Sequence, residues 1–269
     1  MIIDCHMHVW PDHIADAMQS QRPSGMPLRY DGKVSGLLRT MDEVGIDMGL
    51  ALGVGIKASV VARTNEFIGT VPRDRLVPMG TVHPDLSVEE NVRHLKDNGI
   101  VGVKLHPSFQ ELSFDDPRVL DILTALSEEG MPVVAHVGAG DDPVANERGT
   151  PAKLRRIADL LPDLQLVACH YGGYHRLDEA EEHVVGSSVT LETSWPPTMA
   201  ELDPERIVKL IRKHGADRVV FGSDWPIRDF ATQKARLAGA NLAQCEIDAI
   251  LGGNVARLLQ LDQETRRDA

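Results

Sequence analysis

Cysteine is scarce in this chain, and its scarcity excludes one class of protein. The 269 residues include only three cysteines, Cys5, Cys169 and Cys245. Three scattered cysteines in a chain of this length do not build the disulfide framework that small secreted domains use in place of a large core. We therefore expect a reduced, cytoplasmic setting.

Basic residues and long apolar runs are also lacking. The chain carries 28 Lys and Arg against 40 Asp and Glu, a net charge of −12. Such a chain repels nucleic acid and anionic membrane surfaces. No apolar stretch approaches the ~20 residues of a membrane helix. The opening Met1-Ile2-Ile3-Asp4 lacks the charged segment and apolar run of a signal peptide. Neither nucleic acid nor a membrane is expected as a partner. A homo-oligomer is compatible with the sequence, which does not determine the oligomeric state.

What the chain does contain is a regular alternation of strand and helix patterns. Eight short runs rich in Val, Ile and Leu have the composition of parallel strands that are covered on both faces. They are Ile2–His8, Ile46–Val54, Leu76–His83, Ile100–His106, Pro132–Gly138, Leu164–His170, Ser188–Ser194 and Arg218–Asp224. Eight such units in this length, without an internal repeat or a linker, predict an α/β protein. We expect residues 1–269 to form one (β/α)8 TIM barrel.

The helix signals lie between these runs, where a barrel requires them. Ser87-Val88-Glu89-Glu90 is a capping box for a helix that extends to about Asn98. Asp116-Pro117, Thr150-Pro151 and Asp203-Pro204 each place an N-cap residue before a proline at the first helical position. An open doubly wound sheet is the rival architecture. It usually has a glycine-rich phosphate turn after its first strand, and here that strand ends in histidines.

One connection is unusually long. Val9–Lys33 is rich in Pro, Gly and Asp and follows the end of the first strand. Long connections at that edge of a barrel tend to be functional, so we expect this one to cover the site. Trp10 on it, Arg148 after the fifth strand and Trp195 after the seventh are the substrate-binding candidates.

Ionisable side chains end five of the predicted strands. His6 and His8 are two residues apart on the first strand and share a face, together with Asp4. At the other strand ends stand Lys104 and His106, then His136, His170 and Asp224. All of them fall on the C-terminal rim, where barrel enzymes build their sites. Imidazoles with a carboxylate suit Zn²⁺, Mn²⁺ or Fe²⁺ better than Ca²⁺ or Mg²⁺, so we expect a divalent metal there.

With these anchors the sequence resembles the amidohydrolase superfamily, and within it the amidohydrolase-2 group. The resemblance rests on motifs that follow one another in order along nearly the whole chain. They are Asp4-x-His6-x-His8, Gly102-Val103-Lys104-Leu105-His106-Pro107, His136, His170, Gly222-Ser223-Asp224-Trp225-Pro226 and Gly253-Asn254-Val255-Ala256-Arg257-Leu258-Leu259. The group includes decarboxylases of unsaturated or aromatic acids, hydrolases of lactones and esters, and hydratases.

The resemblance implies a role for each of these positions. His6, His8, His136 and Asp224 would hold one divalent metal, Zn²⁺ first and Mn²⁺ as the alternative. Asp224 would also transfer a proton, and His170 would activate water or protonate the substrate. Lys104 is the third catalytic candidate and stands where binuclear branches carry a carboxylated lysine that bridges two metals; the alternative is an unmodified amine that faces the site. In those branches His170 would be a ligand of the second metal. A second metal therefore stays an alternative to the mononuclear site that we favour.

Three functions remain open at this stage. The first is hydrolysis of a small amide, ester or lactone by metal-activated water. The second is non-oxidative decarboxylation of an unsaturated or aromatic acid on the same metal, with a histidine as the acid. The third is a metal-binding barrel without turnover, which the presence of both Asp224 and His170 disfavours. In the first two cases the partner is a small-molecule substrate.

Cys5 and Cys169 precede His6 and His170 directly. Because side chains alternate along a strand, we expect both cysteines to point outward, into the layer between barrel and helices. We interpret them as packing residues and not as thiolate ligands.

Overall fold

The computed structural model describes residues 1–21, 28–140, 142–195 and 202–261. Its eight strands form one parallel sheet in chain order. They are β1 (Ile3–His8), β2 (Met48–Leu52), β3 (Leu76–Gly80), β4 (Gly102–Leu105), β5 (Val133–Ala135), β6 (Leu166–Ala168), β7 (Thr190–Glu192) and β8 (Val219–Val220). The backbone N–H of Cys5 donates to the Phe221 carbonyl (2.8 Å) and that of His8 to the Trp225 carbonyl (2.7 Å), which joins β1 to the last strand. The predicted (β/α)8 barrel is confirmed.

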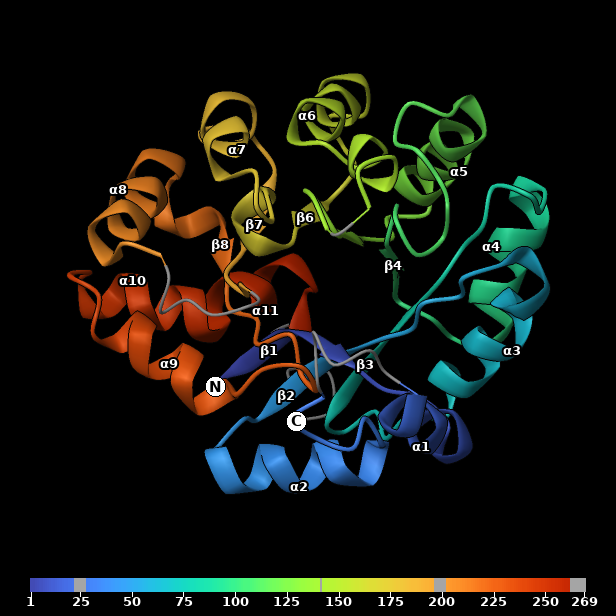
Figure 1. Cartoon of the computed structure of the whole chain (residues 1–269), viewed down its shortest axis with the longest axis horizontal. Helices are drawn as coiled ribbons and strands as arrows, with labels where there is room; N and C mark the ends of the chain where they lie inside the picture. Colours follow the sequence, from blue (N-terminus) through green and yellow to red (C-terminus); the bar gives the residue numbers. More distant parts are fainter. Residues whose placement is uncertain (22–27, 141, 196–201, 262–269) are drawn as a thin grey trace.

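The helices surround these strands (Figure 1). They are α1 (Asp12–Gln21), α2 (Val34–Val44), α3 (Ala58–Gly69), α4 (Val88–Asp97), α5 (Pro117–Glu128), α6 (Pro151–Leu160), α7 (Leu177–His183), α8 (Pro204–His214), α9 (Phe230–Ala238), α10 (Gln244–Asp248) and α11 (Asn254–Leu258). The predicted caps are present: Ser87 and Glu90 form the capping box of α4, and Asp203 accepts from the Glu205 amide at the start of α8. Within the described residues no helix is long and apolar enough to cross a bilayer.

Two apolar clusters fill the barrel and its surroundings. The larger one includes Leu105, Leu154 and Phe221 and lies between the strands and the outer helices. The smaller one includes Ile3, Cys5 and Cys169 from the strands and Val255 from α11. It fills the barrel interior, closed at its N-terminal end by α11. Side chains therefore fill the interior of the barrel, as expected for eight strands.

The connection after β1 differs from the prediction. Residues Asp12–Gln21 form the ten-residue helix α1, so Val9–Lys33 is not one long irregular loop. Ala15 of this helix is fully buried, so one face of α1 packs against the rest of the protein. Residues 22–27 of the connection lie outside the described part of the chain.

Candidate metal centre

β1 brings two histidines into the barrel through a shift in its register. Its pairing with β2 is irregular between Asp4 and Met7. Ile3 and Cys5 lie in the interior cluster, and after the irregularity His6 also faces inward. The expectation that Asp4 shares the face of His6 is therefore wrong, because the bulge breaks the alternation. Asp4 instead accepts from the backbone N–H groups of His6 (2.9 Å) and Ser223 (3.0 Å), and burial raises its pKa to about 7.

Three ligand atoms converge at the C-terminal end of β1 and β8. His6 Nε2 lies 3.1 Å from His8 Nε2 and 3.3 Å from Asp224 Oδ1, and His8 Nε2 lies 3.9 Å from the same oxygen. All three side chains are buried. Burial holds the pKa of both histidines well below the usual range, with the Lys104 charge adding to the effect at His6. Two neutral imidazole nitrogens and a carboxylate in one buried place are a donor set that fits a divalent cation.

His136 and His170 form the other side of the cluster. His136 Nδ1 lies 3.1 Å from His170 Nε2. Ligand atoms of His6, His170 and Asp224 all lie within 4.8 Å of one another. His170 thus also lies beside His6 and Asp224, and His136 is joined to this cluster by its contact with His170. Burial lowers the pKa of His136 to about 3, with Lys104 adding to it, and lowers that of His170 well below its usual range.

Two of these residues occupy unusual backbone conformations. His170 has φ 61° and lies beyond the end of β6, and Asp224 has φ 63° beyond the end of β8. Left-handed backbone is uncommon for residues other than glycine and clusters at functional sites. These turns, and not strand alternation, aim both side chains at the cluster.

Lys104 on β4 is fully buried and also faces the cluster. Its Nζ lies 3.2 Å from His6 Nε2 and donates to Cys169 Sγ at 3.0 Å. Cys169 therefore points into the barrel, and the outward orientation predicted for it and for Cys5 is wrong. Since His170 sits in a turn, alternation with Cys169 does not apply. Burial raises the pKa of Cys169 to about 12, so it is a thiol.

Two functional candidates at the end of β7 were not predicted from the sequence: Glu192 is its last residue and Ser194 follows it. Glu192 Oε2 lies 2.9 Å from His6 Nδ1, and Ser194 Oγ lies 3.0 Å from His170 Nδ1. Both are fully buried, and burial raises the pKa of Glu192 to about 7 against its hydrogen bonds with Ser194. The only available signal was an acid inside the apolar run Ser188–Ser194, where an inward-facing charge needs a partner.

Of the three predicted substrate-binding residues, Trp10 contacts a histidine of the cluster directly and Trp195 contacts one through Tyr174. The Trp10 ring stacks on His8, with centroids 6.1 Å apart. Trp195 contacts Tyr174 (5.7 Å), whose ring in turn contacts His170 (5.3 Å). For Arg148 the structure records backbone bonds: its carbonyl accepts from Phe114 N–H at 3.0 Å. Substrate binding by these three stays a prediction.

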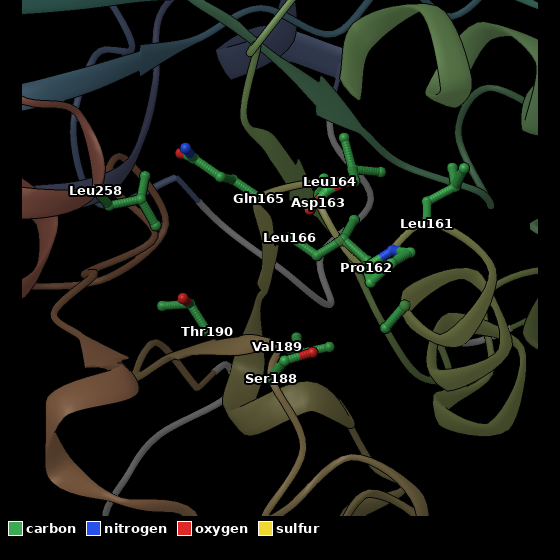
Figure 2. Close-up of a pocket in the computed structure, with 11 residues that line it drawn as sticks. Leu161, Pro162, Asp163, Leu164, Gln165, Leu166, Ser188, Val189, Thr190 and Leu258 are labelled. Atoms are coloured by element: carbon green, nitrogen blue, oxygen red, sulfur yellow. The ribbon is translucent and has the colours of Figure 1, made fainter. Parts of the chain in front are cut away.

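A pocket at the other end of the barrel is separate from this cluster. A hollow of about 170 Å³ is lined there by residues that precede or begin β6 and β7, among them Leu164, Gln165 and Val189, and by Leu258 of α11. Figure 2 shows these side chains. It contains no histidine. The N-terminal face of a barrel contributes to stability, not to chemistry, so this hollow does not compete as the site.

Comparisons with known proteins show the family to which this chain belongs. The model of the amidohydrolase family matches residues 3–261, and the chain belongs to that family. Among curated protein sequences none matches the chain. Solved structures resemble it at low identity, which shows the shared fold.

Three of these structures illustrate the range of relatives. The 5-carboxyvanillate decarboxylase of Sphingomonas paucimobilis has a TM-score of 0.71 and 17% identity, with 96% of this chain and 98% of that chain covered. A dihydroxybenzoic acid decarboxylase of a Polaromonas species, with bound manganese and 2-nitroresorcinol, has a TM-score of 0.74 and 16% identity, with 97% of both chains covered. A probable 2-pyrone-4,6-dicarboxylic acid hydrolase of Acinetobacter baumannii, with citric acid bound, has a TM-score of 0.68 and 17% identity, with 96% and 99% covered.

Proposed function

We propose that the protein is a metal-dependent hydrolase of a small amide, ester or lactone. The observation that carries this proposal is the convergence of His6 Nε2, His8 Nε2 and Asp224 Oδ1 within 3.9 Å. With His136 as the fourth ligand, the set is three imidazoles and one carboxylate, which suits Zn²⁺ or Mn²⁺. A divalent ion bound there polarises the substrate carbonyl and lowers the pKa of water toward ~7.

The residues of the chain supply the rest of the chemistry. Asp224, whose carboxylate lies beside His6, accepts the proton of the attacking water and delivers it to the leaving group. His170 is neutral, and its Nε2 faces the cluster, where it accepts from the attacking water and orients it. Buried surroundings strengthen each of these polar interactions.

Decarboxylation is the second candidate, and one observation favours it. His170 lies within 4.8 Å of both His6 and Asp224, close enough to deliver a proton to a substrate carbon held at the same place. Two of the structural relatives described above are decarboxylases of aromatic acids. On this route the substrate exchanges its carboxylate for a proton and releases CO2.

A parallel assay separates the two reactions. The metal-loaded protein is offered lactones, esters, amides and unsaturated or aromatic acids, and proton release and CO2 release are recorded for each. We expect proton release without CO2 from a lactone or ester. CO2 release from an acid that is otherwise not hydrolysed would replace the hydrolase proposal by the decarboxylase.

Lys104 decides between one metal and two. We propose that it is an unmodified ammonium, because its Nζ already donates to Cys169 Sγ and contacts His6 Nε2. Lys104→Ala is then expected to keep the metal content at about one ion per chain, the same as the wild type. Elemental analysis measures this, and exchange with isotope-labelled bicarbonate detects a carboxylated lysine in the wild type. Two ions in the wild type and one in the variant would establish the binuclear site.

An aromatic stack at the mouth of the barrel predicts a contribution to substrate binding. Phe109 is 60% exposed, and its ring stacks on His106 (3.9 Å), which stacks on His136 (4.0 Å). Phe109→Ala is expected to raise KM about 3- to 10-fold and to leave kcat and metal content unchanged, since an aromatic pair contributes ~0.5–1.5 kcal/mol. Val144→Ala, an exposed apolar residue after β5, is the matched control. Equal effects of both variants on KM would contradict a specific role for Phe109.

A further inference from the structure

Two residues at the end of β7 contact two histidines, one on β1 and one just beyond β6. Glu192 Oε2 contacts His6 Nδ1 at 2.9 Å and accepts from the Ser194 hydroxyl at 2.8 Å. Glu192 Oε1 accepts from the Ser194 backbone N–H. His170 Nδ1 lies 3.0 Å from both the carbonyl oxygen and the hydroxyl of Ser194. Glu192 and Ser194 thus connect His6 to His170 through one buried network.

The chemistry of these partners fixes which ring nitrogens carry hydrogen. A carbonyl oxygen only accepts, so His170 donates through Nδ1 and its Nε2 is an acceptor. The Ser194 amide and hydroxyl donate to the Glu192 carboxylate. An ionised carboxylate has no hydrogen to donate, so it accepts from His6 Nδ1 as well. His6 Nε2 is left as a lone pair, in agreement with its contact with the Lys104 ammonium at 3.2 Å. By the same reasoning His136 Nδ1 donates to His170 Nε2.

We propose that Glu192 and Ser194 are positioning residues that hold His6 and His170 as Nδ1–H tautomers, with both Nε2 atoms directed into the cluster. The inference deepens the proposed function and rests on it for its consequence, because a histidine binds metal only through a nitrogen without hydrogen. Neither residue touches substrate or metal in this proposal. They act through the histidines.

The neighbouring backbone is shaped to admit this carboxylate. Gly222, just after β8, lies so close to Glu192 that a Cβ built at position 222 would overlap the carboxylate. Glycine at 222 therefore leaves the space in which Glu192 reaches His6. The pair is separated by 186 positions in sequence, so only closure of the barrel creates it.

Glu192→Gln tests the proposal with almost no change in volume. Both carboxylate oxygens accept hydrogen bonds, so a glutamine must turn its NH2 group toward one of the donors. With its oxygen kept on the Ser194 amide, the NH2 faces His6 Nδ1 and drives His6 to the Nε2–H tautomer. The affinity for Zn²⁺ or Mn²⁺ should then fall about 10- to 100-fold, the range for losing such a partner of a metal-binding histidine.

The matched control is Thr193→Val. Thr193 stands between Glu192 and Ser194 in the sequence. Thr193 Oγ1 accepts from the Gly222 backbone N–H at 3.2 Å, and the side chain is buried. This variant disturbs the same strand end without touching a histidine, so its metal affinity should match the wild type. Metal affinity is measured for each variant by competition with a chelator. Tautomers are read from proton–nitrogen NMR spectra of the metal-free proteins with labelled histidine.

These two readouts separate failure of the inference from failure of the proposed function. If Glu192→Gln keeps both the wild-type affinity and the Nδ1–H form of His6, the positioning role is overturned and the metal site stands. If the wild type binds neither metal, the metal site fails, and the NMR spectra still decide whether Glu192 sets the tautomer. A variant that does not fold is replaced by Gly222→Ala, whose methyl group displaces the carboxylate and should produce the same change in His6.

Discussion

Replacing His6 and His8 together by alanine is expected to abolish metal binding and turnover. The two rings supply half of the proposed ligand set, and their Nε2 atoms lie 3.1 Å apart at its centre. The remaining carboxylate of Asp224 and imidazole of His136 follow other strands, and two ligands do not hold Zn²⁺ against competing water. Metal content should fall from about one ion per chain to the level of a protein without a site. Elemental analysis after dialysis against a weak chelator measures this.

The same experiment needs a control for the loss of two histidines. His94→Ala/His183→Ala removes a histidine from α4 and one from α7, both remote from β1. That variant should keep its metal and its activity. Because His6 and His8 are buried, thermal unfolding of the double variant is compared with that of metal-free wild type. Full metal retention in His6→Ala/His8→Ala would end the proposal of a metal at this place.

The sequence predicts the barrel and much of the cluster for a common reason. All eight predicted strands are present, although each is shorter than its predicted range and β8 is only Val219–Val220. Parallel strands place their C-terminal ends on one rim, so residues at those ends must meet whatever the details of packing. His6, Lys104 and Asp224 could be brought together on this argument alone.

What the sequence does not show depends on local departures from regular geometry. The bulge in β1 separates Asp4 from His6, and the left-handed turn at His170 frees it from the alternation that would have turned Cys169 outward. No glycine or proline stands within the β1 bulge or at His170 itself to predict these departures from regular geometry. Glu192 was missed because its partner is a histidine on another strand, and the register that joins them follows from closure of the whole barrel.

Asp224→Asn is expected to separate metal binding from proton transfer. Asp224 is assigned two roles, whereas His6 and His8 only hold the ion. Asparagine keeps the shape of the side chain and a carbonyl oxygen that can bind metal, but it lacks the basic oxygens that accept a proton. Metal content should therefore be retained in part, while kcat falls by ~10²–10⁴, the contribution of general acid–base catalysis.

Metal occupancy and turnover must be measured on one preparation of this variant, so that loss of the ion is not mistaken for loss of chemistry. Asp229→Asn is the matched control, because Asp229 accepts from the Tyr30 hydroxyl at 3.2 Å and caps α9, away from the ligand atoms. Its kcat should equal that of the wild type. A near-normal kcat for Asp224→Asn at full occupancy would transfer the proton-transfer role to His170. It would also favour decarboxylation, in which a histidine delivers the proton to carbon.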